Sequence, residues 1–533
     1  MKVNNYISMF FLAGAALLAS CSQDEEAALD NQDALKGFQI SVTDEGFTHA
    51  DGATRAVESG YATRFTNGDE IGIFAVRGDA VVSDINNRKF TLQDGVWELT
   101  DDGDPIEYKG SQFQKMQFYA YYPYNKNVQF DATSAKPFEA YVAKWTVGAN
   151  QGEGDYTKYD LMTSVGTVKG DRLKGQIAFD MKHEMALAVV KMPKLTYHFT
   201  NVEVADYQLP LKAGSFTLNN AAATAYYQES TDTYRFLVNP NKEFTIKGTY
   251  TGVGEMEYEA KGTLESGTAK LYTIKDESKI EHALQVGDYF CADGKLVSKD
   301  AETAPENAIG IVCHVGNPQP SVTHPGNNTE ANDALRRDYP ACVHGLVLSL
   351  KNSVVEGYAT HMFHSGKEGN YSDWFTKEEA WMDKFVGCNT ERDANKNDAS
   401  KVFPALMGYN NTQLLTMCYE GMGQPATCDW AYKHIMAYRE EVPVPAVTTP
   451  WYLPSIMCWD TVAKALGVIN PNLLKVSGDE MTSVDANALT NHFWSSTQRS
   501  ATFQWTHGMD GGRYTIICER GSRAGYFRMM LAF

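Results

Sequence analysis

The feature that most constrains the fold is a period-two alternation of apolar and polar residues, repeated in short segments over residues 37–193. Phe38, Ile40 and Val42 lie on one face of an extended segment, which is the pattern of a half-buried β-strand. Similar patterns predict strands at residues 71–76, 117–122, 176–179 and 186–192. Turn-forming residues separate them at 67–69, 101–104 and 123–125. Because no convincing helix interrupts the series, residues 37–193 are predicted to form a β-sandwich.

A second, smaller β-sandwich is predicted over residues 194–285. Short alternating segments continue there, at residues 234–238, 243–250 and 270–274. A chain of 533 residues has room for about three or four domains in all.

The amino-terminal segment carries the pattern of a bacterial export signal. Lys2 precedes an apolar run over residues 9–18, and small residues at 19 and 20 lead to Cys21. The ending resembles a lipobox, so residues 1–21 are predicted to be a lipoprotein signal with Cys21 as the acylated residue. The alternative is an ordinary cleaved signal peptide in which Cys21 has no role. Residues 22–36 are acidic and polar, and predict a flexible tether.

Net charge and hydropathy limit the kinds of partner that the chain is expected to bind. The net charge of −19 is offset by no basic stripe, which argues against nucleic acid. After residue 20 no apolar stretch approaches the ~20 residues that a membrane-spanning helix needs. The lipid would therefore attach the protein to the membrane.

The chain changes character near residue 286. After Cys21 no cysteine occurs until Cys291, and the other cysteines are Cys313, Cys342, Cys388, Cys418, Cys428, Cys458 and Cys518. An exported protein meets an oxidising compartment, so disulfides are possible, but buried free cysteines are also common and the pairing stays open.

Helical and extended segments mix over residues 286–533. Thr376 and Glu379 have the spacing of a capping box before a helix that ends at Gly387. Ser455 is predicted to cap a second helix, with Ile456, Trp459, Val462 and Leu466 inward and an end at Gly467. Strands are predicted at residues 308–313, 345–350, 492–495 and 526–533.

The amino-terminal half resembles the fimbrillin family of Bacteroidetes, the pilins of lipoprotein-derived fimbriae. The resemblance rests on residues 54–56 (TRA), 63–76 (TRFTNGDEIGIFAV), 118–124 (FYAYYPY), 160–162 (DLM) and 177–188 (IAFDMKHEMALA). It implies a mainly β fold with two transthyretin-like β-sandwich pilin domains.

The resemblance also implies donor-strand assembly. In that family an Arg-directed protease cuts near the amino terminus, the first strand leaves, and the open groove accepts a strand from another subunit. Arg55 and Ala56 stand where that cut would fall, although Arg64 and Arg77 lie nearby. The implied partners are other fimbrial subunits by strand exchange, and the outer membrane through the lipid.

Residues 286–533 resemble an α+β C-type-lectin-like module of bacterial surface proteins. The segments that carry this resemblance are 451–455 (WYLPS), 493–497 (FWSST) and 525–533 (GYFRMMLAF). The resemblance implies a recognition domain for a host or bacterial surface protein or glycan. A folded strand at 526–533 could not also be donated, so the chain would be a tip or accessory pilin in adhesion.

No residue pattern predicts catalysis, a metal or a cofactor, so the chain is predicted not to be an enzyme. His183 is interpreted as a core-edge histidine, and His361 and His364 as residues of an exposed loop. Trp459 and Trp494 are predicted to be core residues. Trp505 and Arg513, expected in a loop, are weak candidates for ligand contact, whereas Arg523 and Arg528 are predicted to pair with carboxylates.

A rival hypothesis from the same sequence is a surface lipoprotein that does not polymerise. It would keep its lipid and bind a glycan or a host protein. Retention of the acylated Cys21 and an uncut chain after Arg55 would distinguish it from a pilin.

Overall fold

The computed structural model describes two compact units of the chain. The described residues are 39–50, 61–62, 64–106, 116–168, 175–325, 329–355, 405–421, 429–482, 492–498, 503–509, 516–519 and 525–533. The first unit comprises Met1–Lys191, Ser215–Gly248 and Glu257–Ile274, and the second comprises Met192–Gly214, Thr249–Met256 and Lys275–Phe533. Residues 194–285, predicted as a separate small sandwich, are therefore shared between the two units.

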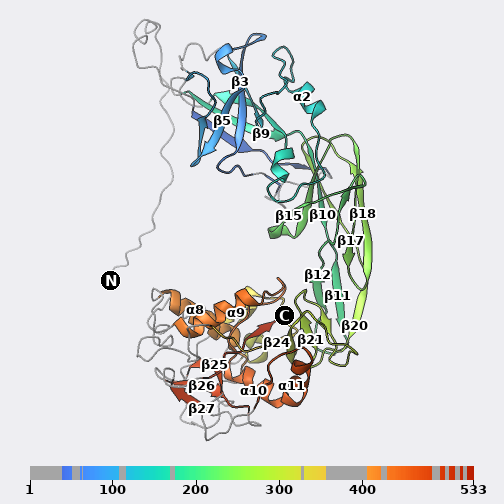
Figure 1. Ribbon diagram of the computed structural model, residues 1–533, viewed down its shortest axis with the longest axis vertical. Coiled ribbons are helices and arrows are strands. Elements are labelled where there is room, and N and C mark those ends of the chain that lie inside the picture. Colours follow the sequence, from blue (N-terminus) through green and yellow to red (C-terminus); the bar gives the residue numbers. More distant parts are fainter. Residues whose placement is uncertain are drawn as a thin grey trace, which may run out of the picture. The chain divides into compact units, whose positions relative to one another are not determined.

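The first unit contains a large sheet of eight strands (Figure 1). Its strand order is β1-β9-β8-β7-β3-β5-β6, and β4 pairs with β3. β1 runs parallel to β9, whereas the other neighbours are antiparallel. The strands are β1 (Gln39–Asp44), β3 (Glu70–Arg77), β4 (Ala80–Val81), β5 (Arg88–Gln93), β6 (Val96–Leu99), β7 (Gln117–Tyr122), β8 (Met162–Val168) and β9 (Gln176–His183).

A second sheet of the first unit has the order β15-β16-β10-β19-β2. Its strands are β2 (Thr48–His49), β10 (Ala186–Lys191), β15 (Tyr226–Gln228), β16 (Thr233–Val238) and β19 (Thr268–Thr273). A four-stranded sheet comprises β13 (Thr217–Leu218), β14 (Ala221–Ala222), β17 (Glu243–Thr251) and β18 (Glu255–Thr263). The strands predicted for residues 38–42, 71–76, 117–122, 176–179 and 186–192 are confirmed to within a few residues.

The large sheet buries both of its faces. Ile71, Ile73 and Ala75 of β3 point into one apolar core, while Phe74 points into the other. The second core also takes Leu187 and Val189 of β10, together with Leu237 and Ala269, so it lies between the two sheets. This layering confirms the predicted β-sandwich character, and the alternation of strand side chains explains how one strand can serve two cores.

Short helical segments interrupt the β-structure of the first unit. They are η1 (Ser83–Ile85), α2 (Glu139–Lys144), η2 (Tyr156–Tyr159) and η4 (Glu229–Thr231). The expectation of no helix in residues 37–193 is therefore wrong for α2. Six residues are too few to show a helical period, and such a short helix needs tertiary packing, which buried Tyr141 provides.

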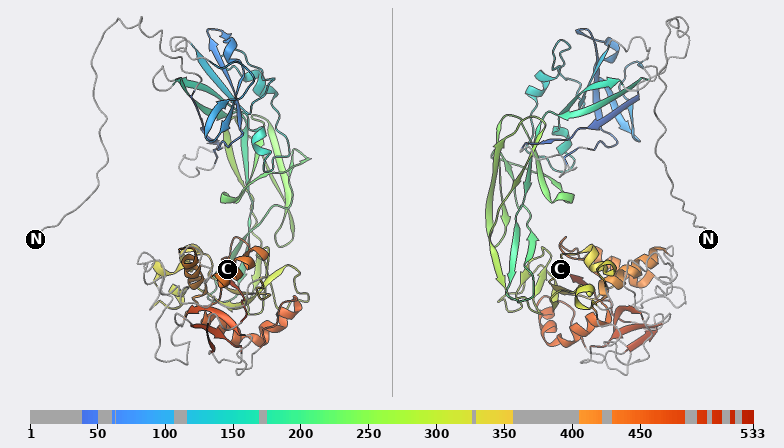
Figure 2. Two further views of the ribbon diagram at one scale, coloured as in Figure 1. Left: turned by 60° about the vertical axis from the view of Figure 1, so that its left-hand side comes forward. Right: turned by 180° about the vertical axis from the view of Figure 1, so that it is seen from behind.

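In its described residues the second unit combines β-sheets with helices (Figures 1 and 2). The sheets have the orders β12-β11-β20, β22-β21-β23-β24-β28 and β25-β26-β27. Their strands are β11 (Lys194–Phe199), β12 (Tyr207–Pro210), β20 (Lys279–His282), β21 (Tyr289–Cys291), β22 (Leu296–Val297), β23 (Ala308–Val315), β24 (Gly345–Ser349), β25 (Phe493–Gln498), β26 (Phe503–His507), β27 (Ile516–Glu519) and β28 (Met530–Ala532).

Several helices of the second unit contact strands of these sheets. The described helices of the unit are α3 (Pro320–Thr323), η5 (Glu330–Asn332), α4 (Ala334–Asp338), α8 (Gly408–Gly421), α9 (Asp429–Glu441), α10 (Ile456–Lys464) and α11 (Leu466–Lys475). As predicted, Ser455 caps α10, since its hydroxyl accepts a hydrogen bond from the Cys458 backbone N–H. The helix ends at Lys464 rather than at Gly467, because Leu466 begins α11. The helix predicted after Thr376 lies outside the described residues.

The segment 526–533 forms less strand than predicted but is fully packed. Only β28 is a strand, and Tyr526 makes an isolated bridge with Phe493. β28 pairs with β24 on one side. On its other side Thr449 and Tyr452 exchange hydrogen bonds with Ala532 and Met530. Both hydrogen-bonding edges of β28 are therefore occupied.

The Phe533 side chain closes an aromatic cluster within the second unit. It is 0 % exposed, and its ring centroid lies 5.1 Å from that of Phe290, 5.6 Å from that of Tyr207 and 5.8 Å from that of His344. These contacts come from β21, β12 and the residue before β24. The cluster fixes the end of the described chain to the core of the unit.

We expect Phe533→Ala to lower the free energy of unfolding of the second unit by roughly 3–5 kcal/mol, because it leaves a cavity among these rings. Denaturant unfolding of the full chain would measure the loss. Leu474→Ala in α11 is the matched control, since Leu474 is 57 % exposed and its truncation should change stability by less than about 0.5 kcal/mol. Equal effects of the two substitutions would contradict the structural role of Phe533.

Candidate functional site

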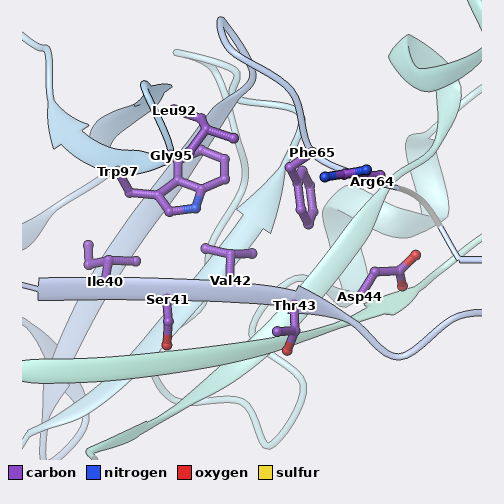
Figure 3. Close-up of a pocket in the computed structure, with 10 residues that line it drawn as sticks. All are labelled: Ile40, Ser41, Val42, Thr43, Asp44, Arg64, Phe65, Leu92, Gly95 and Trp97. Atoms are coloured by element: carbon purple, nitrogen blue, oxygen red, sulfur yellow. The ribbon is translucent and has the colours of Figure 1, made fainter. Parts of the chain in front are cut away.

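A groove of about 520 Å³ lies beside β1 in the first unit (Figure 3). The five residues Ile40 to Asp44 of β1 form one wall, and the opposite wall comes from Arg64, Phe65, Leu92, Gly95 and Trp97. These residues belong to the chain before β3, to β5, to the β5–β6 turn and to β6. The groove therefore separates the two edge strands of the large sheet, β1 and β6.

Only a few side chains of β1 contribute to the core beside the groove. Its residues alternate between exposed and half-buried, and the half-buried Ile40 and Val42 pack on the first core. Figure 3 shows both pointing toward Trp97 and Phe65, whereas Ser41 and Thr43 point away. One edge of β1 pairs with β9 over the full strand, from Gln39 opposite Gln176 to Asp44 opposite Met181. The other edge borders the groove.

The carboxyl end of β1 is fastened by a buried histidine. His183 Nε2 lies 2.9 Å from one carboxylate oxygen of Asp44 and 3.1 Å from the other. His183 Nδ1 lies 2.8 Å from Oδ1 of Asp160. The imidazole also stacks on Phe47, with ring centroids 3.7 Å apart and planes 17° apart. We call Asp44, His183 and Asp160 the histidine clamp.

The electrostatics of the clamp favour a charged imidazolium. Burial acts to lower the pKa of His183, but the two carboxylates outweigh it and raise that pKa to about 9. The side chains of His183 and Asp160 are 0 % exposed and that of Asp44 is 2 % exposed. Between two carboxylates, both ring nitrogens act as donors, which is the hydrogen-bonding pattern of the protonated ring.

Tyr156 and Arg235 belong to the same electrostatic neighbourhood. Burial raises the pKa of the Tyr156 phenol well above its ordinary value, Asp160 and Asp44 raise it further, and Arg235 lowers it. The Arg235 guanidinium lies over the Tyr61 ring, 5.3 Å from its centroid. Tyr156 therefore interacts electrostatically both with the two carboxylates of the clamp and with Arg235.

The chain beyond β1 contacts the second sheet of the same unit. β2 pairs in parallel with β19, and the backbone N–H groups of Thr48 and Ala50 donate to the carbonyl oxygens of Gly267 and Ala269. Residues 39–50 are thus held by β9, by the histidine clamp and by β19. The described chain resumes at Tyr61, whose backbone carbonyl accepts a hydrogen bond from the Phe47 N–H.

Most predicted site residues lie outside the described residues. These are Cys21, Arg55, Ala56 and Arg513, and also Arg523, His361 and His364. Their predicted roles stay predictions.

The sequence predicts Trp505 in a loop, but the structure places it in a strand. It lies in β26 and is 4 % exposed, and its backbone carbonyl accepts a hydrogen bond from the Ser495 hydroxyl at 2.7 Å. The glycines and Asp510 that follow Trp505 favour a loop, and they outweighed the alternating pattern of the five-residue strand. Its role as a contact residue stays a prediction.

Other side chains follow the predictions in part. Trp459 and Trp494 are fully buried, which confirms them as core residues. The Arg528 guanidinium is also buried, but it donates to the backbone carbonyls of Ser349, Leu350 and Asp479 rather than to carboxylates. Burial lowers its pKa to about 10. The predicted carboxylate partner for Arg528 is therefore wrong.

Four cysteine side chains of the second unit are described, and all four are free and buried: Cys291, Cys313, Cys342 and Cys458. Burial raises the pKa of Cys291 and of Cys342 to about 12. The side chains of Cys388, Cys418, Cys428 and Cys518 lie outside the described residues, so their pairing stays open.

Sequence reasoning missed Asp44 and Asp160 as partners of His183. The histidine itself was noted and interpreted as a core-edge residue, and its burial agrees with that. The partners are 139 and 23 residues away in the chain, and no spacing rule links them. The available signal was that Asp44 follows Ile40 and Val42 with the same period of two.

Two further features bear on function. Within the described ranges no group of three or more histidine, cysteine, aspartate or glutamate residues is placed to hold a metal ion. No helix in that part of the chain is long and apolar enough to cross a membrane.

Comparison with known proteins defines the class. Residues 54–286 match a family described as Fimbrillin-like. A Bacteroides ovatus protein named "Putative fimbrium tip subunit Fim1C" is 34 % identical over 506 residues, which cover 90 % of each chain. The crystal structure of a fimbrial protein from Bacteroides ovatus has 30 % identity and a TM-score of 0.54, and the match covers 93 % of this chain and 99 % of that one.

The chain belongs to the fimbrillin-like family, whose members are fimbrial subunits. The proteins it resembles are structural components of fimbriae. This membership confirms that the chain is not an enzyme.

The histidine clamp predicts a specific pH dependence of stability. The folded pKa of His183 is about 9, above the 6.5 of a free histidine, so its stabilising effect is complete below pH 6.5 and is lost as the pH rises through about 9. We expect the wild type to lose roughly 2–3 kcal/mol of unfolding free energy across this window relative to His183→Gln. Denaturant unfolding at pH 6 and pH 9.5 would measure the difference. Parallel pH profiles for the two chains would contradict the clamp.

Proposed function

We propose that this chain is a tip or accessory subunit of a fimbrium, which mediates surface adhesion after proteolytic maturation and donor-strand assembly. Its membership of the fimbrillin-like family supports the fimbrial part. The name of the Bacteroides ovatus relative, as a fimbrium tip subunit, favours the tip among positions in the assembly.

The observation that carries the proposal is the contrast between two strands. β1 is half-buried and borders an open groove on one edge, so its departure would expose a ready acceptor for another strand. β28 has hydrogen-bonded neighbours on both edges and is fully buried. A subunit built this way can accept a strand, whereas its segment Met530–Phe533 is committed to its own core.

Maturation would begin at the membrane. We propose that Cys21 carries the lipid, that the chain reaches the outer membrane with residues 22–36 as a tether, and that cleavage follows Arg55. The cut would leave β1 and β2 on the released fragment, since Ala50 and Tyr61 flank it in the described chain. Ala56 would then be the first residue of the assembled subunit.

Residues 286–533, which lie within the second unit, are the proposed recognition part. We propose that residues 286–533 form a C-type-lectin-like domain, whereas residues 37–193 and 194–285 belong to the transthyretin-like pilin part. The ligand would be a glycan or a protein on a host or bacterial surface. Trp505 and Arg513 are proposed contact residues, and the burial of Trp505 makes Arg513 the better first target for substitution.

We expect the mature protein from the cell surface to begin at Ala56 and to be recovered in high-mass assemblies. Arg55→Ala should preserve the acylated Cys21 start and leave only monomer, because the first strand could not leave. Amino-terminal sequencing and the intact mass would measure this. Arg64→Ala is the matched control, since Arg64 is exposed and lines the groove nearby, and it should mature normally.

A wild-type protein recovered only as an acylated monomer would contradict the proposal. The same result would support the rival function, a surface lipoprotein that binds a glycan or host protein without polymerising.

A further inference from the structure

The inward face of β1 carries two apolar residues followed by an acid. Ile40, Val42 and Asp44 share one side of the strand, opposite Ser41 and Thr43 (Figure 3). Ile40 and Val42 pack on the first core, and the Asp44 carboxylate accepts a hydrogen bond from His183 Nε2. The contacts of β1 thus change from apolar to ionic within a single strand.

The apolar surface and the ionic partner that β1 contacts would both remain on the subunit if β1 left. Phe65, Leu92 and Trp97 would line the apolar part of the groove. At its end His183 would keep Asp160 on Nδ1 but lose the partner of Nε2. An incoming strand that covered His183 without offering an acceptor would bury an unsatisfied donor, which is costly, and more so when the donor carries charge.

We infer that the groove selects its incoming strand by sequence pattern, and that His183 is the residue that reads the acidic position. The partner is an extended segment of another subunit with two apolar side chains at alternate positions and a carboxylate two residues after the second. It would lie parallel to β9, as β1 does. This inference rests on the proposed strand exchange and specifies what is exchanged.

The charge around the clamp supports a carboxylate at that position. Asp160 faces His183 from the segment before β8, and Tyr156 and Arg235 complete the neighbourhood. The next ionisable residues are engaged elsewhere, since Glu184 accepts a hydrogen bond from Thr163 and exposed Lys182 lies 3.9 Å from Glu45. A neutral amide could accept from Nε2, but it would leave the imidazolium with a single counter-charge.

The register makes the pattern strict. Side chains alternate across a strand, so a shift of one residue would turn both apolar side chains out of the core and the acid away from His183. Apolar packing and the ionic contact therefore fail together in the wrong register. A donor strand with the right composition in the wrong order would be rejected.

The test uses the full chain cut by an Arg-specific protease, with the first strand displaced by labelled peptides. The probe is a peptide of residues 37–50, compared with its Asp44→Asn form and with a form in which Ile40 and Ser41, and Val42 and Thr43, exchange places. The substitutions are in the peptide, so folding of the chain is not at stake. Fluorescence anisotropy measures affinity on the wild type and on His183→Gln.

We expect the Asn peptide to bind the wild type at least about tenfold more weakly than the Asp peptide, because the His183 imidazolium would face a neutral amide oxygen in place of a second carboxylate. On His183→Gln the ratio should fall below about threefold. The acid preference should also fade as the pH rises through about 9, where His183 loses its proton. The exchanged peptide should bind neither chain.

Two results overturn the inference in distinguishable ways. Equal binding of the Asp and Asn peptides, with rejection of the exchanged peptide, would remove the role of His183 and leave strand exchange intact. An unchanged acid preference on His183→Gln would do the same, and would point to Arg235 instead. Failure of every peptide to displace the first strand would refute strand exchange, and the inference with it.

Discussion

The large sheet of the first unit is buried on both faces, and the rest of that unit follows from this constraint. Every residue from Ile71 to Val76 in β3 is buried, with alternate side chains in two different cores. The Tyr121 ring of β7 covers Gly72, since a Cβ at Gly72 would collide with Cε1 of Tyr121. A sheet packed on both faces meets other molecules chiefly at its edges, where backbone groups are unpaired.

The two edge strands of this sheet, β1 and β6, are less buried than its central strand β3. β1 contributes two half-buried aliphatic side chains, which is modest for a strand that covers a core. The histidine clamp supplies a directional contact in addition, and a buried ionic contact depends sharply on geometry. An edge strand held in this way is positioned accurately while burying little apolar area, and its proposed exchange would leave most of the two cores in place.

The sequence predicted the strands well because each is a local pattern. Residues 117–122 were predicted as a strand and form β7 over the same residues, and Ser455 caps α10 as its spacing indicated. Contacts distant in the chain were not predictable in this way. The clamp joins three residues from three segments of the chain. Arg528 donates to backbone carbonyls that come together only in the folded protein. Trp505 was misplaced because flanking turn residues outweighed a strand of five residues.

The clamp also bears on how a pilin could discriminate among strands. Apolar pockets distinguish side chains of similar size only weakly, because one methylene is worth about 1–3 kcal/mol at most. A buried polar group discriminates more strongly, since a wrong partner leaves it unsatisfied. In the proposed strand exchange Phe65, Leu92 and Trp97 would provide affinity for apolar side chains, whereas His183 would set the position of the one acid. A fimbrium assembled from several similar subunits would need such discrimination, and under this proposal one buried imidazole would supply it without altering the apolar groove.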